Sequence, residues 1–329
     1  MGSKNIFYDA PGKFQDTRFE RIHNVTFPSA AEASRLVAEE IATGIRSSIK
    51  KPYILGLATG SSPIGVYKEL VSLHKKEGLS FKNVITFNLD EYFPIEKNDL
   101  LSYNHFMNYH LFDHIDIPKE NINIPKGNIS SKNIYSYCNE YEKKINDLGG
   151  LDFQLLGIGR TGHIGFNEPG SNKNSVTRLV SLDFITKEDA AGDFNGIDNV
   201  PDKAITMGVD TIMKAKRIVL LAWGHKKSEK VAKSIEGPIS SMVPASFLQA
   251  HSNTSIILDE EASSELTRYK TPWLVKDCKW NDNLRKKAIA WLCNKLQKPI
   301  LKLTQRDYNE NGLSDLLETE GSGYELNIW

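Results

Sequence analysis

Two side chains that can move protons follow directly after one apolar segment of the chain. Residues 153–158 form an apolar run that predicts a buried strand, and several glycines behind it let the backbone turn sharply. His163 and Glu168 lie in this glycine-rich stretch. Histidine exchanges protons near neutral pH, and an open α/β sheet binds ligands beyond the carboxyl ends of its strands. We therefore expect both residues at a ligand site.

A small polar loop, Thr59-Gly60-Ser61-Ser62, follows a second apolar run at residues 53–58. Ser62 is expected to be the N-cap, and Pro63 the first residue, of a helix over residues 64–73. Free backbone N–H groups and the helix dipole at such a junction can hold a phosphate; the alternative is a tight turn without a ligand. The loop matches neither the Walker motif nor the dinucleotide fingerprint, so no nucleotide cofactor is implied.

Two adjacent acids and one lysine complete the candidate residues. Asp90 and Glu91 follow an apolar run at residues 83–89, where an acid is either a helix cap or a functional group. Lys227 is expected in the first turn of the helix after a strand at residues 217–223. There it either meets an anion or is a solvated lysine.

The elements that position these residues alternate between strands and helices from residue 53 to residue 258. This order predicts an α/β fold with a doubly wound, mainly parallel, Rossmann-like sheet. A capping box at Ser29 predicts a helix to about residue 48, and the aromatic segment 102–112 is expected to be a helix packed on the sheet. The charged segment 187–199 is expected to be a mobile lid.

Composition excludes several classes of partner. The 329 residues contain 41 Lys and Arg against 41 Asp and Glu, so no overall field attracts nucleic acid or anionic lipid. No apolar run approaches the roughly 20 residues that span a bilayer. The three cysteines, Cys138, Cys278 and Cys293, form neither a disulfide framework nor a zinc site. We expect a cytoplasmic protein.

Three parts are expected along the chain. Residues 1–18 read as an irregular arm, residues 19–274 as the α/β domain, and residues 275–329 as a mostly helical extension with an amphipathic helix at 282–296. The composition changes from Pro272 on, and the sequence ends on the apolar residues Ile328 and Trp329.

Three motifs in order and spacing resemble the glucosamine-6-phosphate deaminase family. They are Leu57-Ala58-Thr59-Gly60-Ser61-Ser62-Pro63, Phe87-Asn88-Leu89-Asp90-Glu91-Tyr92 and Gly162-His163-Ile164-Gly165-Phe166-Asn167-Glu168-Pro169. The similarity extends over about residues 19–274, and the Asn-Glu-Pro ending separates deaminases from the related 6-phosphogluconolactonases. The resemblance implies conversion of glucosamine 6-phosphate and water to fructose 6-phosphate and ammonia, with no metal and no organic cofactor.

The resemblance also implies roles for the candidate residues. His163 carries the proton for sugar-ring opening, Glu168 holds and polarises it, and Asp90 is the base that moves a proton from C2 to C1. The substrate phosphate lies on the backbone of Thr59, Gly60, Ser61 and Ser62 with Lys227 opposite. Glu91 is expected beside the substrate.

Three departures from the family pattern stand out. Thr161 replaces an aspartate that orients the histidine, and a hydroxyl cannot stabilise an imidazolium with a full charge. The lid segment 187–199 has no arginine for the phosphate, so either Lys187 substitutes or the loop and Lys227 suffice. Some members are activated by N-acetylglucosamine 6-phosphate through an Arg-x-Lys pair; here Arg178 is followed by Val180, which predicts no such activation.

Two other functions remain open at this point. One is a sugar-phosphate sensor with weak or no turnover, and the other is a lactonase or another phosphosugar isomerase of the same fold. The family commonly assembles, which is compatible with a homo-oligomer. The extension beyond residue 274 suggests a module of a longer two-domain protein.

Overall fold

The computed structural model describes residues 18–320, and these belong to two compact units. One unit extends to Ser263 and the other begins at Ser264. The boundary therefore precedes the one expected near residue 274. The physical reason is Trp273, which is buried in the apolar core of the second unit.

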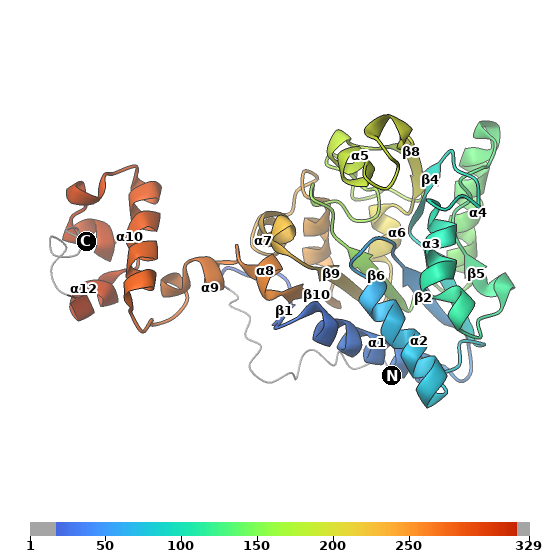
Figure 1. The fold of residues 1–329 in the computed structure, drawn as a ribbon, viewed down its shortest axis with the longest axis horizontal. Coiled ribbons are helices and arrows are strands. Elements are labelled where there is room, and N and C mark those ends of the chain that lie inside the picture. The colour runs from blue at the N-terminus through green and yellow to red at the C-terminus, as the bar shows by residue number, and fades with distance from the viewer. Residues whose placement is uncertain (1–17, 321–329) are drawn as a thin grey trace. The chain divides into compact units, whose positions relative to one another are not determined.

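A seven-stranded parallel sheet forms the centre of the first unit (Figure 1). Its strands are, in spatial order, β1 (Asn24–Phe27), β10 (Thr254–Asp259), β9 (Ile218–Ala222), β6 (Phe153–Gly157), β2 (Tyr53–Leu57), β3 (Val84–Asn88) and β5 (Ile122–Asn123). Every ladder in this sheet is parallel. The doubly wound parallel fold expected from the alternating pattern is confirmed.

Helices cover both faces of the sheet (Figure 1). They are α1 (Ala30–Ser47), α2 (Ile64–Glu77), α3 (Tyr103–His110), α4 (Ile134–Asp147), α6 (Val209–Met213), α7 (Ser228–Ile235) and α8 (Glu260–Ser263). α1 begins at the expected N-cap, where the Ser29 hydroxyl accepts a hydrogen bond from the backbone N–H of Glu32. On one face, α1 and α2 pack on the sheet around Ile41, Leu55 and Leu70. α4 lies on the other face, where Tyr141 contacts Phe87 edge to face.

A second, three-stranded antiparallel sheet stands beside the first, and sequence reasoning did not predict it. It consists of β4 (Asp90–Phe93), β8 (Lys203–Thr206) and β7 (Arg178–Ser181), and α5 (Phe184–Ala190) follows β7. Asp90 and Glu91 were expected at the end of a buried strand. Only Leu89 separates β3 from β4, however, so both acids begin a strand that pairs with β8.

The second unit is helical, as expected. It contains α9 (Thr267–Lys270), α10 (Asp282–Leu296), α11 (Gln305–Asn309) and α12 (Ser314–Glu320). Its own core includes Trp273, Leu292 and Tyr308. α10 has the predicted bounds.

Two sequence-based expectations concern residues outside the range 18–320 that the structure describes. Most of the N-terminal arm (residues 1–17) and the apolar end at Ile328 and Trp329 lie outside the described residues. Among the described helices, none combines the length and apolar character that crossing a bilayer requires.

Candidate active site

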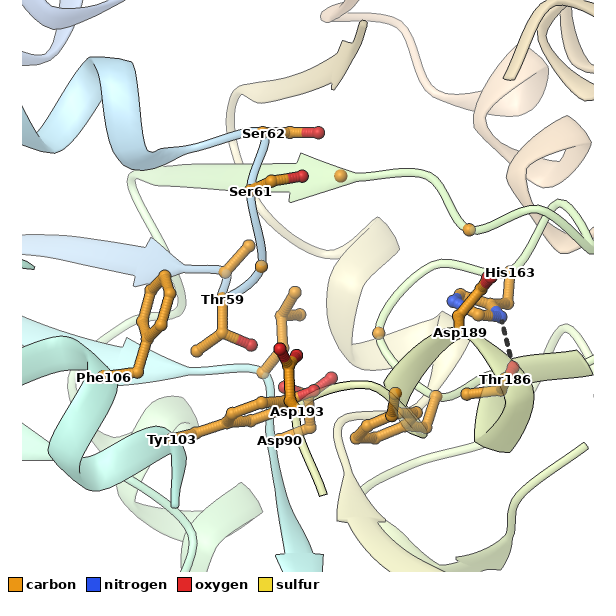
Figure 2. A pocket seen from close by; sticks show the side chains of 18 of the residues that line it. Thr59, Ser61, Ser62, Asp90, Tyr103, Phe106, His163, Thr186, Asp189 and Asp193 are labelled. Atoms are coloured by element: carbon orange, nitrogen blue, oxygen red, sulfur yellow. Dashed lines mark hydrogen bonds between the residues drawn. The ribbon is translucent and has the colours of Figure 1, made fainter. Parts of the chain in front are cut away.

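A cavity of about 760 Å³ opens beyond the carboxyl ends of β2, β3, β6 and β9. β2 and β6 are neighbours at its centre, and the chain leaves them toward opposite edges of the sheet, which is where such folds bind ligands. The predicted residues that line it are Thr59, Gly60, Ser61, Ser62, Asp90, His163 and Lys227. Figure 2 labels Thr59, Ser61, Ser62, Asp90 and His163 among them. Thr161 and Glu168 contact Nδ1 of His163 and do not line the cavity themselves. Glu91 does not line this cavity.

The loop after β2 presents free backbone donors. Gly60 has a φ of +88°, a conformation that favours glycine, and within residues 18–320 no protein atom accepts a hydrogen bond from the N–H groups of residues 60–62. Trp223 Nε1 donates to the carbonyl of Ser62 at 3.0 Å and fixes the loop. The N-cap prediction was wrong by one residue: Pro63 is the cap and no side chain caps α2.

His163 is held on one ring nitrogen. Its Nδ1 lies 2.9 Å from Oε2 of Glu168, 2.9 Å from Oγ1 of Thr161 and 3.3 Å from Oγ1 of Thr186. Nε2 lies above Gly159, where any side chain would overlap the imidazole. Among the described residues Nε2 has no hydrogen-bond partner, so it is the nitrogen available to a ligand.

Glu168 is ionised by its surroundings. Burial raises the pKa of its carboxyl, but hydrogen bonds from His163, Thr186 and Thr161 and the charge of His163 bring the pKa below its usual value. Thr186 of α5 donates to Oε1 at 2.6 Å, and Thr161 donates to Oε2 at 3.1 Å. A carboxylate, that of Glu168, therefore orients the imidazole. Sequence reasoning missed Thr186, which carries no motif.

Asn167 fixes the loop that bears Glu168. This fully buried residue donates from Nδ2 to the carbonyls of Ile164 and Met207 at 2.9 and 2.8 Å, and Arg178 Nη1 donates to its Oδ1 at 2.9 Å. The loop is thereby attached to the small sheet. At Gly165, with φ +56°, a side chain would come within 3.3 Å of Asp90 Oδ2, so the loop backbone passes close to that carboxyl.

Asp90 is a buried acid. Burial, and secondarily the charge of Glu91, raise the pKa of the Asp90 carboxyl well above its usual value. The resemblance implies that Asp90 acts as a base, and a base must be ionised. An adjacent positive charge lowers the pKa of a buried carboxyl.

Glu91 points to the other side of β4, as strand alternation requires. Its carboxylate accepts hydrogen bonds from the backbone N–H groups of Tyr92 (3.0 Å), Tyr103 (2.9 Å) and Asn104 (2.9 Å). Burial raises its pKa to about 7, against these hydrogen bonds. Glu91 thus supports the first turn of α3, which brings Tyr103 to the cavity.

Aromatic side chains form the wall next to Asp90, and most of them were not expected at the site. Tyr92 lies 4.9 Å from Tyr103, 5.4 Å from Phe166 and 5.2 Å from Phe194, measured between ring centroids. All four line the cavity. The aromatic segment of α3 was interpreted only as packing on the sheet, and the sequence gives no signal that Tyr103 faces a ligand.

Two cationic side chains line the same cavity as the loop at residues 59–62. Lys227 is half-buried, and its ammonium makes no hydrogen bond or ion pair within residues 18–320; burial lowers its pKa. Arg160 also lines the cavity. Lys187 is paired with Asp202 at 2.5 Å and is not among the lining residues. In the described part of the chain no group of three metal-ligating side chains gathers.

Residues 28–257 match the family model described as glucosamine-6-phosphate isomerases/6-phosphogluconolactonase. The chain belongs to this family. A glucosamine-6-phosphate deaminase of Clostridium botulinum is 46% identical over 235 residues, which cover 71% of this chain and 95% of the relative. A glucosamine-6-phosphate deaminase of Oceanobacillus iheyensis is 45% identical over 71% of this chain and 92% of its own length.

A longer relative covers the second unit as well. A glucosamine-6-phosphate deaminase-like protein of Bacteroides thetaiotaomicron is 49% identical over 95% of this chain, and the chain spans about half (47%) of its length. Among solved structures, a monomeric glucosamine-6-phosphate deaminase matches with a TM-score of 0.72 and 43% identity over 74% of this chain and all of that one. A Trypanosoma cruzi 6-phosphogluconolactonase (TM-score 0.61, 21% identity, 74% and 97% covered) shares the fold.

Proposed function

We propose that this member of the family converts glucosamine 6-phosphate and water to fructose 6-phosphate and ammonia. The observation that carries the proposal is that the His163–Glu168 pair, Asp90 and a loop with free N–H groups meet at one cavity. The proposal is supported by the similarity of this chain to two glucosamine-6-phosphate deaminases, which it matches over almost their full length.

The substrate phosphate binds to the N–H groups of residues 60–62 and to Lys227. A phosphate anchored at this end places C1 and C2 of the sugar deeper in the cavity, toward Asp90 and His163. Binding energy from the phosphate is in this way used to orient the reacting carbons.

His163 opens the sugar ring. Nε2 takes the proton of the O1 hydroxyl and returns a proton to the ring oxygen as the C1–O5 bond breaks, which leaves an aldehyde at C1. While His163 carries both protons, Glu168 at 2.9 Å from Nδ1 stabilises its charge. Thr161 and Thr186 keep the carboxylate in place.

Asp90 then transfers the C2 proton. Its carboxylate removes this proton while the ammonium group gives one of its protons to the aldehyde oxygen, so an enolamine with a hydroxyl at C1 forms. The Asp90 carboxyl then delivers the C2 proton to C1, which leaves a protonated imine at C2. Water adds to C2 and ammonia leaves, so fructose 6-phosphate results. The ammonium group of the incoming amino sugar lies beside Asp90 and lowers its pKa, so a buried acid becomes an ionised base when its own substrate is bound.

The test is to incubate the chain with glucosamine 6-phosphate, 6-phosphogluconolactone or glucose 6-phosphate and to follow ammonia, acid release and ketose formation separately. The proposal predicts ammonia and fructose 6-phosphate in equal amounts from the first substrate and no hydrolysis of the lactone. Lactone hydrolysis would indicate a lactonase. Tight binding of glucosamine 6-phosphate without ammonia would indicate a sensor.

The wider setting of the chain is part of the same proposal. The B. thetaiotaomicron relative, which matches over 95% of this chain and 47% of its own length, supports a module of a longer two-domain protein. We further propose that it acts in the cytoplasm, which its three free cysteines favour. Family membership is compatible with a homo-oligomer, and sedimentation of the purified chain decides its assembly.

A further inference from the structure

Arg160 is a cation of the cavity to which the reaction described above gives no task. It lies in the loop between β6 and His163 and lines the cavity. Its guanidinium is bound by two carboxylates of α5: Nη2 donates to Glu188 Oε2 at 2.7 Å, and Nε lies 2.6 Å from Asp189 Oδ1. Both acids are half-exposed, so this pairing is accessible to a competing anion.

The loop that bears Arg160 lies close to the loop at residues 59–62. A side chain on Gly157, at the start of the same loop, would stand 3.8 Å from Ser62 Cβ. The charge of Arg160 reaches Lys227: after burial, which lowers the Lys227 pKa most, the charge of Arg160 lowers it further and that of Asp189 raises it. Arg160, Lys227 and residues 60–62, with their free N–H groups, all line this one cavity.

We propose that Arg160 is a phosphate-binding residue that exchanges the carboxylates of Glu188 and Asp189 for the substrate phosphate. This inference rests on the proposed function, because it assigns the phosphate to the loop at residues 60–62. A guanidinium fork fits two oxygens of a carboxylate or of a phosphate equally well. The phosphate dianion carries the charge of both carboxylates on one group and is also held by Lys227 and by the loop, so it displaces the two acids.

The exchange supplies an arginine to the phosphate although the predicted lid segment, residues 187–199, contains none. Lys187, the cation expected from the sequence to substitute, is paired with Asp202 outside the cavity. α5 contributes acids instead, and the arginine comes from the neighbouring loop. The same helix carries Thr186, whose hydroxyl donates to Glu168. α5 therefore connects the partner of Arg160 with the support of the catalytic pair.

Binding of inorganic phosphate tests the exchange without requiring turnover. The dissociation constant is measured by titration calorimetry at low ionic strength for the wild type, Arg160→Gln, Arg160→Lys and Asp189→Asn. We expect about tenfold weaker binding for Arg160→Gln, as loss of a charge-assisted contact implies, and a smaller loss for Arg160→Lys, which lacks the fork. Asp189→Asn should bind phosphate more tightly, because it removes a competitor. Lys187→Gln, a cation on the same helix but outside the cavity, is the matched control and should bind as the wild type does.

Three results would overturn the inference. The first is unchanged phosphate binding in Arg160→Gln, and the second is no phosphate binding by the wild type. The third is phosphate binding that is weakened as much in Asp189→Asn as in Arg160→Gln, which would mean that the ion pair of Arg160 and Asp189 only supports the loop. Circular dichroism and the melting temperature identify a variant that has lost its fold. If Arg160→Gln is such a variant, Asp189→Asn decides whether the inference holds, because tighter phosphate binding supports it and weaker binding contradicts it. Kinetics give a second readout: Arg160→Gln should lower kcat/KM for glucosamine 6-phosphate about tenfold. Absence of ammonia release by the wild type would contradict the proposed function alone.

Discussion

The carboxylate of Glu168 lies 2.9 Å from Nδ1 of His163, and the hydroxyl of Thr161 donates to the same carboxylate oxygen at 3.1 Å. The acid that holds the imidazole therefore comes from the end of the loop, five residues after the histidine. Glu168→Gln keeps the shape but removes the charge that stabilises the imidazolium. We expect kcat to fall by about 100-fold or more, the usual scale for acid–base groups. Steady-state ammonia release measures this; a loss below about threefold would show that Glu168 is dispensable.

Replacement of Thr161 by aspartate should not improve the enzyme. If the threonine limited ring opening, Thr161→Asp would raise kcat and shift the pH profile. The structure predicts a fall instead, because the new carboxylate would lie against Glu168 and like charges repel. Thr161→Ser keeps the hydroxyl and serves as the control, with activity near that of the wild type. A faster Thr161→Asp variant would contradict the role given to Glu168.

Asp90→Asn should abolish turnover and stabilise the fold. The folded-state pKa of Asp90 is raised by burial above the value of about 3.9 for an unfolded aspartate. As pH rises above about 4, the unfolded chain therefore releases a proton that the folded chain keeps, and stability falls. Asparagine removes this loss, so the gain in unfolding free energy should be larger at pH 8 than at pH 5.

Urea denaturation at the two pH values measures the effect of Asp90→Asn. Asp198→Asn, at an exposed position in the lid segment, is the control and should show no such pH-dependent gain. Equal effects of Asp90→Asn at pH 5 and pH 8 would mean that the folded-state pKa of Asp90 is not raised.

A buried ion pair under the sheet makes a separate prediction for stability. Arg217 Nε lies 2.8 Å from Glu40 Oε1, and the two side chains are 1% and 2% exposed. Arg217→Met leaves the Glu40 charge buried and should cost about 3–5 kcal/mol of unfolding free energy. The double variant with Glu40→Met should recover most of this loss. If the two losses simply add in urea denaturation, the pair is not coupled.

N-acetylglucosamine 6-phosphate should not activate the chain. Arg178 is committed to Asn167 at 2.9 Å, and Val180, at the position where the resemblance implies the lysine of an Arg-x-Lys pair, packs against an apolar cluster. The rate at subsaturating glucosamine 6-phosphate is therefore expected to stay constant, or to fall by competition, when the acetylated sugar is added. A rate increase would contradict this prediction.

The main sheet was predictable because its strands are short apolar runs bounded by glycine or polar residues. β2, β6 and β9 all lie within the expected segments. The small antiparallel sheet was not predictable: Asp90 to Phe93 directly follow a buried strand, and no sequence pattern shows that the chain changes sheets at Leu89. The prediction that Ser62 caps α2 was wrong for a related reason. The carbonyl of Ser62 accepts a hydrogen bond from Trp223, a contact between residues far apart in sequence.

At the site, sequence motifs located His163, Asp90 and the loop at residues 59–62, because these residues directly follow strands of one sheet. They did not reveal Thr186 or Arg160. Thr186 reaches the cavity through the packing of α5 against the His163 loop, a long-range contact without a local signal. Arg160 follows β6 directly, but no motif marked it as a site residue. Glu91 shows the converse: adjacency to Asp90 suggested a shared role, but alternation along β4 turns its side chain toward α3.

The most direct test of the account is the yield of ammonia and fructose 6-phosphate from glucosamine 6-phosphate, measured side by side for the wild type and Asp90→Asn. The account predicts equal amounts of both products from the wild type and none from the variant, which should still bind inorganic phosphate with unchanged affinity. Turnover that survives in Asp90→Asn, or a wild type that binds the sugar phosphate and releases no ammonia, would contradict it.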